Sequence, residues 1–268
     1  MGYIAGVDLG SGATKTVIVD EDACIVGQGL VRTQADFEAI AQKSMDEACQ
    51  MAGIDRQQID YIATTGLGRH SLDHRDIQIT DLTCGARGAH ALFPDAGYVL
   101  DMGAQCTRAM SLRDGGKVKS FRTNEKCAAG SGGFLERICR YLEIKIDEVG
   151  ELSLDADDPQ PISSVCAVLA ESEIINHVSE GVTVPNILRG AHESLAERSM
   201  SQLKLVGVDG PIVFIGGVAR QAGMLAACNE RFEYPLYVPD HPAHVAAYGA
   251  AILGLQRYLK RSQVATTT

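Results

Sequence analysis

The chain has 268 residues, of which 46% are hydrophobic and 22% charged, and its formal net charge is −10. This apolar content suffices for one large packed domain or two small ones. The acidic balance and the lack of a basic run exclude nucleic acid or an anionic membrane surface as an expected main partner. With no apolar stretch near the roughly 18 residues of a membrane span, no secretory signal and eight dispersed cysteines, a reduced, cytoplasmic protein is expected.

The first part of the chain is predicted to open with two antiparallel hairpins. A glycine-containing turn at 8–12 joins two β-prone segments, whereas the glycine turn of a dinucleotide-binding fold leads directly into a helix. Apolar residues then recur at three- and four-residue spacing, as in an amphipathic helix. The elements predicted in chain order are strands at 3–7, 14–19 and 25–32, a helix at 37–52, a strand at 59–64 and a helix at 80–92.

Residues 98–123 repeat the opening pattern of strand, Asp-x-Gly turn, strand, turn and strand. The sequence therefore predicts two similar lobes, a first lobe at 1–95 and a second at 96–268, with the C-terminal helix able to pack back on the first. An acidic segment with a proline, 155–159, is expected to be an exposed loop. The remaining predicted elements are helices at 132–142, 167–179 and 186–206, a strand at 212–215, a helix after it and a last helix at 243–259.

Three glycine-rich turns predict a nucleotide site. Glycines let main-chain N–H groups approach a polyphosphate because no Cβ blocks them. In the first turn, Asp8 is expected to face Mg²⁺ through water, and Lys15 or Thr14 to reach a phosphate oxygen. The alternative is an ordinary hairpin with an acidic residue in it. The first turn reads Gly6-Val7-Asp8-Leu9-Gly10-Ser11-Gly12.

The other two turns favour the nucleotide site over the ordinary hairpin. Asp101 and Gly103 form a second Asp-x-Gly turn, and a strand that ends in Gly216-Gly217 leaves room for an adenosine. This order resembles the α/β fold of the actin, hexokinase and Hsp70 ATPases, with two similar lobes around a nucleotide cleft. Kinases, chaperones and plain ATPases share that fold, so the fold alone does not name the reaction.

Two cysteines lie just before predicted helices. Cys127 precedes Gly130-Ser131-Gly132, and Cys166 precedes the helix at 167–179. A helix start stabilises a thiolate through its free N–H groups and dipole. Two cysteines cannot supply the four thiolates of an iron–sulfur cluster, although two subunits with two cysteines each would. From spacing alone, the preferred interpretation is two small buried core residues.

A family resemblance changes that preference. The chain resembles, nearly end to end, the ATPase activators of the 2-hydroxyacyl-CoA dehydratase and benzoyl-CoA reductase family. The resemblance implies a 4Fe-4S cluster shared by two subunits on Cys127 and Cys166, and ATP hydrolysis that drives a low-potential electron into a partner reductase. The runs that carry it are GVDLGSGATK, ATTGLGR, CAAGSG with GFLERI, SSVCAVLAESEIIN and GGVA.

The three glycine-rich turns and the family resemblance together predict the residues of a nucleotide site and of a cluster site. Asp8 and Asp101 are the predicted catalytic residues, and ATP or ADP with Mg²⁺ and the cluster are the predicted cofactors. Cys24, Cys49, Cys84, Cys106, Cys139 and Cys228 match no ligand position. The predicted cofactor-binding residues are Gly10, Ser11, Gly12, Lys15, Gly103, Gly130, Gly132, Gly216 and Gly217.

Within the family, the runs at 170–176 and 184–192 resemble the smaller, D-type, ATPase subunit of benzoyl-CoA reductase. Dehydratase activators tend to read D-x-G-G-Q-D at the second turn, whereas Ala104 and Cys106 stand here. The expected partners are a paralogous ATPase subunit or a second copy, reductase catalytic subunits and a ferredoxin-type electron donor. The alternatives are an activator of a 2-hydroxyacyl-CoA dehydratase and, in another class, a cluster-free small-molecule kinase.

Two motifs remain open at this point. Thr64-Thr65-Gly66-Leu67-Gly68-Arg69 either closes over the nucleotide or is a plain loop. Glu171 either positions a water or faces a partner, but a carboxylate near a helix start is more often only a partner of the helix dipole.

Overall fold

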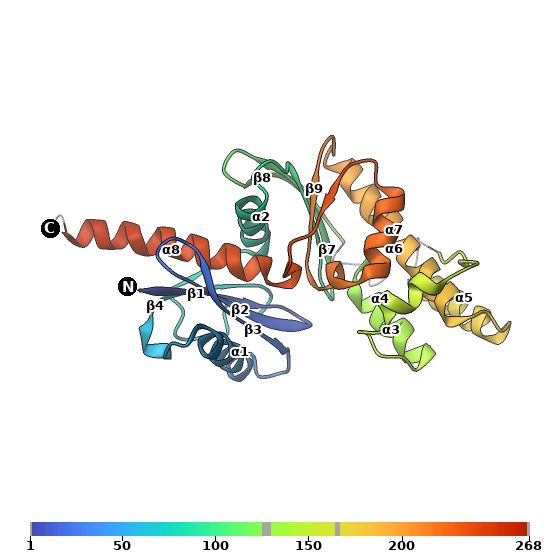
Figure 1. The fold of residues 1–268 in the computed structure, drawn as a ribbon, viewed down its shortest axis with the longest axis horizontal. Helices are drawn as coiled ribbons and strands as arrows, with labels where there is room; N and C mark the ends of the chain where they lie inside the picture. The colour runs from blue at the N-terminus through green and yellow to red at the C-terminus, as the bar shows by residue number, and fades with distance from the viewer. Residues whose placement is uncertain (1, 125–129, 164–166, 267–268) are drawn as a thin grey trace. The chain divides into compact units, whose positions relative to one another are not determined.

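The computed structural model describes residues 2–124, 130–163 and 167–266. The chain forms two compact units, each built on a five-stranded sheet (Figure 1). The sequence-based division into 1–95 and 96–268 differs from these units in the short segment 113–118 and in the C-terminal helix. The first unit comprises Met1–Pro94, Arg113–Val118 and Ala243–Thr268, and the second Asp95–Leu112 and Lys119–Pro242.

The sheet of the first unit has the order β3-β2-β1-β4-β5. Its first three strands form antiparallel hairpins, and β4 and β5 continue the sheet in parallel. The helix predicted at 37–52 is present with those bounds, capped by Asp36 at its start and by Gly53 at its end. The elements are β1 (Tyr3–Leu9), β2 (Ala13–Val19), β3 (Ile25–Arg32), α1 (Phe37–Ala52), β4 (Ile59–Thr65), β5 (Ile77–Gln78), α2 (Asp81–Leu92) and α8 (Val245–Thr266).

Alternation along β1 sends its side chains to two helices. Ile4 packs with Ala247 and Ala251 of α8, whereas Ala5 packs with Ala48 of α1. Because side chains in a strand alternate between the two faces of its sheet, α1 and α8 cover opposite faces.

The C-terminal helix α8 packs with its main chain close to the main chains of α2 and β1. A Cβ atom built on Gly249 would lie 1.9 Å from the carbonyl oxygen of Cys84 in α2, and one on Gly6 would lie 2.0 Å from the carbonyl oxygen of Ala247. Glycines at these positions let two main chains approach without a side chain between them. This contact explains why the last helix belongs to the first unit although it ends the chain.

The second unit repeats the arrangement with the sheet order β10-β9-β6-β7-β8. β6 pairs antiparallel with β7 and parallel with β9. Its helices bury a core that includes Leu100, Phe134, Ile187 and Phe214. The elements are β6 (Tyr98–Met102), β7 (Thr107–Arg113), β8 (Lys117–Thr123), α3 (Gly132–Leu142), α4 (Val149–Leu152), α5 (Ala167–Ser179), α6 (Val184–Leu205), β9 (Ile212–Ile215), α7 (Ala222–Arg231) and β10 (Leu236–Tyr237), with 3-10 turns η3 (Ser153–Asp155) and η4 (Gly217–Arg220). The 3-10 turn η1 (Arg56–Gln58) belongs to the first unit, and η5 (Pro242–His244) stands where the chain passes from the second unit to the first.

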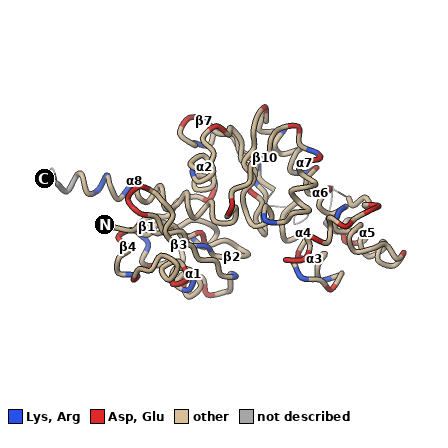
Figure 2. The backbone as a smooth tube through the Cα atoms, in the orientation of Figure 1, with Lys and Arg blue, Asp and Glu red and all other residues tan. Residues whose placement is uncertain are grey.

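The charged residues belong to both units. Figure 2 shows acidic and basic positions along the elements of each. Within the part of the chain that the structure describes, no helix has the length and apolar character needed to cross a membrane.

Candidate functional site

The first unit holds a carboxylate and a cation on neighbouring strands. Asp8 near the end of β1 is the register partner of Lys15 in β2, and Lys15 Nζ lies 2.6 Å from Asp8 Oδ2. Only 10% of the Asp8 side chain and 13% of the Lys15 side chain are exposed. Because removing two charges from water costs much of what their attraction returns, such a pair contributes little net stability.

The turn after β1 is held open by hydrogen bonds to the end of β3. Thr33 Oγ1 donates to the Gly10 carbonyl oxygen at 2.8 Å, and Thr33 N–H donates to the Gly12 carbonyl oxygen at 3.1 Å. A Cβ on Gly10 would lie 2.9 Å from Lys15 Nζ. A side chain there would crowd the ammonium group, so glycine keeps the space beside it clear. The sequence alone did not point to Thr33, because this residue follows β3 in a polar segment without a motif.

The second unit has an equivalent pair of a carboxylate and a cation at equivalent positions of its first hairpin. Asp101 in β6 is the register partner of Arg108 in β7, and Arg108 Nη1 donates to Asp101 Oδ2 at 3.3 Å. Both side chains are mostly buried. The sequence reading missed Arg108, although it stands seven residues after Asp101 as Lys15 stands seven after Asp8. That shared spacing was the available signal.

In the second unit the structure brings the predicted turns together. Gly132 N–H, at the start of α3, donates to the Gly103 carbonyl oxygen at 2.9 Å, and Gly130 accepts from Thr107 Oγ1 at 2.6 Å. A Cβ on Gly132 would lie 2.9 Å from Cγ2 of Val218 in the turn that begins at Gly216. The Asp-x-Gly turn after β6, the start of α3 and the turn that begins at Gly216 are thus neighbours.

The predicted cluster ligands Cys127 and Cys166 lie outside the described residues. Of the other six cysteines, Cys24 is exposed, Cys106 is partly exposed, and Cys49, Cys84, Cys139 and Cys228 are buried. No group of three or more His, Cys, Asp or Glu side chains suited to a metal occurs within the described ranges. Glu171 lies 2.7 Å from Arg137 Nη1 and within 3.4 Å of the Tyr141 hydroxyl, so it joins α5 to α3.

A buried histidine lies beside the glycine turn of the second unit. His192 Nδ1 is 2.9 Å from Ser153 Oγ, and Nε2 is 3.0 Å from Gln221 Oε1 at the end of η4. Burial lowers the pKa of His192 from its ordinary 6.5 to about 4, helped by the nearby charge of Arg189 and opposed by the bond to Gln221. The imidazole is therefore neutral at pH 7.

This burial predicts a pH-dependent stability. Below pH 6.5, His192 of the unfolded chain binds a proton, whereas His192 of the folded chain stays neutral down to about pH 4. The free energy of unfolding therefore decreases as the pH drops from 6.5 to 4. The expected loss is about 3 kcal/mol. Denaturant unfolding across that range measures it, with His192→Gln as the control that cannot titrate. Equal pH dependence in the two proteins would contradict the prediction.

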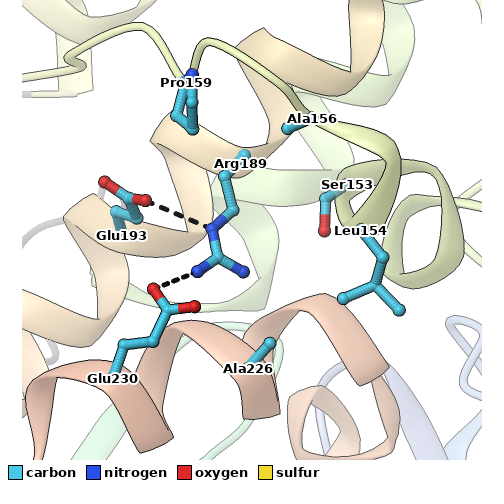
Figure 3. Close-up of a pocket in the computed structure, with 8 residues that line it drawn as sticks. All are labelled: Ser153, Leu154, Ala156, Pro159, Arg189, Glu193, Ala226 and Glu230. Atoms are coloured by element: carbon cyan, nitrogen blue, oxygen red, sulfur yellow. Dashed lines mark hydrogen bonds and ion pairs between the residues drawn. The ribbon is translucent and has the colours of Figure 1, made fainter.

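A separate pocket in the second unit has a volume of about 380 Å³. At its wall the guanidinium of Arg189 is held between the carboxylates of Glu193 and Glu230 (Figure 3). None of the predicted site residues lines it. The three side chains carry one positive and two negative charges, a net charge of −1, so this group does not attract a phosphate.

The two five-stranded sheets, each with a carboxylate-bearing hairpin, define the class of fold. The fold is of the actin and hexokinase type. A glucokinase of the ROK family from Streptomyces griseus, with glucose and AMPPNP, matches it with a TM-score of 0.57 over 95% of this chain and 100% of that chain. At 14% identity this likeness concerns the fold alone.

The chain belongs to the BadF/BadG/BcrA/BcrD ATPase family, which it matches over residues 5–254. It is 40% identical to the D-type subunit of benzoyl-CoA reductase from Thauera aromatica over 98% of this chain and 97% of that protein. The solved activator of 2-hydroxyisocaproyl-CoA dehydratase from Clostridium difficile, with bound ADPNP, is 32% identical, with a TM-score of 0.92 over 97% of each chain. The predicted family and fold are confirmed, and the protein is a member of an ATPase family.

Proposed function

We propose that this protein is the ATP-hydrolysing component that drives low-potential electrons into a benzoyl-CoA reductase, the module that removes aromaticity from its substrate. The observation that carries the proposal is the repeated hairpin, Asp8 with Lys15 and Asp101 with Arg108, in a chain 40% identical to the D-type component of a benzoyl-CoA reductase. Each hairpin carries the groups that a Mg-polyphosphate needs, namely carboxylate oxygens for the metal and a cation for the phosphates.

The nucleotide is proposed to bind as Mg-ATP. Asp8 and Asp101 supply carboxylate oxygens, which Mg²⁺ prefers and usually contacts through retained water. Main-chain N–H groups of the glycine-containing turn after β1 are proposed to bind phosphate oxygens, and Lys15 adds a charge. A Cβ on Gly217 would meet no atom within 4 Å, so packing does not require glycine there and the space suits an adenosine. The proposed binding residues are Gly10, Ser11, Gly12, Lys15, Gly103, Gly130, Gly132, Gly216 and Gly217.

The electron carrier is proposed to be a 4Fe-4S cluster held by Cys127 and Cys166 with two cysteines of a second subunit. The support is the position of both residues before helices in the sequence, and family membership. Thiolates are the usual ligands of such clusters, which carry single electrons at low potential. The second subunit is proposed to be a paralogous ATPase or another copy, and the electron donor a ferredoxin-type protein.

A second target has support of its own. The likeness to the dehydratase activator of known structure favours an activator of a 2-hydroxyacyl-CoA dehydratase. Against it stand Ala104 and Cys106, where dehydratase activators tend to carry a glycine and an aspartate. The kinase alternative has only the fold likeness at 14% identity behind it.

The test is electron transfer measured anaerobically with the protein reconstituted with its second subunit. Reduced protein should pass electrons to a benzoyl-CoA reductase catalytic component with ATP, and at least about 100-fold more slowly with ADP or without nucleotide, since each 1.4 kcal/mol of coupling is tenfold. Each electron transferred should accompany hydrolysis of ATP to ADP and phosphate.

Equal rates in all three nucleotide states would overturn the coupling. ATP-dependent transfer to a 2-hydroxyacyl-CoA dehydratase component alone would replace the proposed target by the alternative. A phosphorylated small-molecule product in place of free phosphate would assign the chain to the kinases.

A further inference from the structure

The repeat extends beyond the hairpins to a third strand in each unit. In the first unit β4 runs parallel to β1 with Asp8 opposite Thr65, and Gly66 follows directly. In the second unit β9 runs parallel to β6 with Asp101 opposite Ile215, and Gly216 follows directly. The turn that begins at Gly66 therefore occupies the place in its unit that the proposed adenosine turn occupies in the other.

Both glycines abut the carboxylate of their unit. Gly66 has φ +86°, and a Cβ on it would lie 2.4 Å from Asp8 Oδ1 and 2.7 Å from the Leu9 carbonyl oxygen. Gly216 has φ +96°, and its Cβ would lie 2.8 Å from Asp101 Oδ1. Each aspartate is thus confined on one side by a cation and on the other by a glycine main chain.

Hydrogen bonds hold the turn at Gly66–Arg69 in place beside β1. Gly68 N–H donates to the Leu9 carbonyl oxygen at 3.0 Å, and Arg69 Nη1 donates to the Gly66 carbonyl oxygen at 3.1 Å. Thr64 Oγ1 donates to the Arg69 carbonyl oxygen at 2.7 Å. An alanine methyl group at position 66 would meet both the Asp8 carboxylate and the Leu9 carbonyl oxygen. Because these bonds hold the main chain, the flexible carboxylate is the group that shifts at the lower cost.

We propose that Gly66 is a positioning residue of the nucleotide site, which sets the Asp8 carboxylate for the Mg²⁺ of Mg-ATP as Gly216 sets Asp101. The Gly66–Arg69 turn is then a working part of the site rather than a plain loop. This inference rests on the proposed ATPase function. It also explains why Thr65-Gly66 and Ile215-Gly216 stand at corresponding strand ends.

The test compares Gly66→Ala with Gly53→Ala. Gly53, at the end of α1, also has a positive φ, +67°, but its Cβ would meet no atom within 4 Å. Both variants bear the backbone cost of alanine at positive φ, and only the first adds a methyl group that meets other atoms, namely the Asp8 carboxylate and the Leu9 main chain. Gly66→Ala should raise the Mg²⁺ concentration for half-maximal ATP hydrolysis about tenfold, because a small misplacement of a ligand is costly. Binding of a fluorescent ATP analogue in EDTA should stay within about twofold of wild type, and Gly53→Ala should change neither quantity.

An unchanged Mg²⁺ midpoint in Gly66→Ala, or equal shifts in both variants, would overturn the proposal and leave the ATPase function intact. Absence of ATP hydrolysis in the wild type would overturn the function itself and this inference with it. If Gly66→Ala does not fold, Arg69→Met tests the same idea by removing one of the three bonds that hold the turn, the side-chain hydrogen bond from Arg69 to the Gly66 carbonyl oxygen. It should raise the Mg²⁺ midpoint about threefold, and a wild-type midpoint there would equally refute the proposal.

Discussion

Replacing Asp8 by asparagine should lower ATP hydrolysis by about 100-fold or more, because preorganised charges at a reacting phosphate typically contribute factors of 10² to 10³. The change keeps the shape of the side chain and removes its charge. Lys15, whose Nζ lies 2.6 Å from the carboxylate, then loses its counter-charge, and a Mg²⁺ ion would lose an anionic ligand. Phosphate release at saturating Mg-ATP measures the effect.

Loss of folding must be separated from loss of chemistry in this variant. Removing one partner of a buried ion pair is destabilising, so thermal unfolding and nucleotide binding should be recorded on the same samples. Asp46→Asn is the matched control, since Asp46 makes the same type of ion pair with Arg56 on the exposed surface of the same unit. Undiminished turnover in a folded Asp8→Asn protein would remove Asp8 from the proposed catalytic residues.

Replacing Cys127 or Cys166 by serine should remove nearly all protein-bound iron and weaken subunit association in the same step. A cluster that takes two thiolates from each of two subunits loses half of one side's ligands with either change. Iron and sulfide analysis after anaerobic purification, together with analytical ultracentrifugation, gives both readings. The expectation rests on the sequence and on family membership, since both cysteines lie outside the described residues.

Cys24→Ser is the control for this experiment. Cys24 is an exposed free thiol in the first unit, so its loss should leave iron content and association unchanged. A brown, iron-replete protein in Cys127→Ser or Cys166→Ser would remove that residue from the ligand set. Loss of iron without any change in association would show that the cluster does not hold the two subunits together.

Much of the local structure around the candidate site could be predicted from sequence, because the signals for strands, turns and helices are local. Asp8 and Asp101 each directly precede a glycine-containing turn between β-prone segments, and the elements β1 to β3 and β6 to β8 lie where the sequence predicts them. Helix α1 likewise has its predicted bounds, because its apolar stripe and its closing glycine lie close together in the chain. Short-range patterns of this kind depend on backbone preferences that neighbouring residues share.

Contacts between distant segments were decided only by the tertiary structure. Gly66 abuts Asp8 because β4 pairs with β1 across an intervening hairpin and helix, and the sequence reading left that turn open. Gly103, Gly132 and Val218 meet although more than a hundred residues separate the first from the last. Helix α8 rests on β1 because Gly6 permits the approach.

The physical reason for this division is the range of the interactions. A turn or an amphipathic helix is set by residues within a few positions of one another, so the sequence determined the two hairpins, the two aspartates and the glycine turns. Strand pairing and helix packing depend on which surfaces exclude water together, and that is settled by the whole chain. Only the tertiary structure therefore determines the burial of His192, the contact of Asp8 with Gly66 and the packing of α8 on the first sheet.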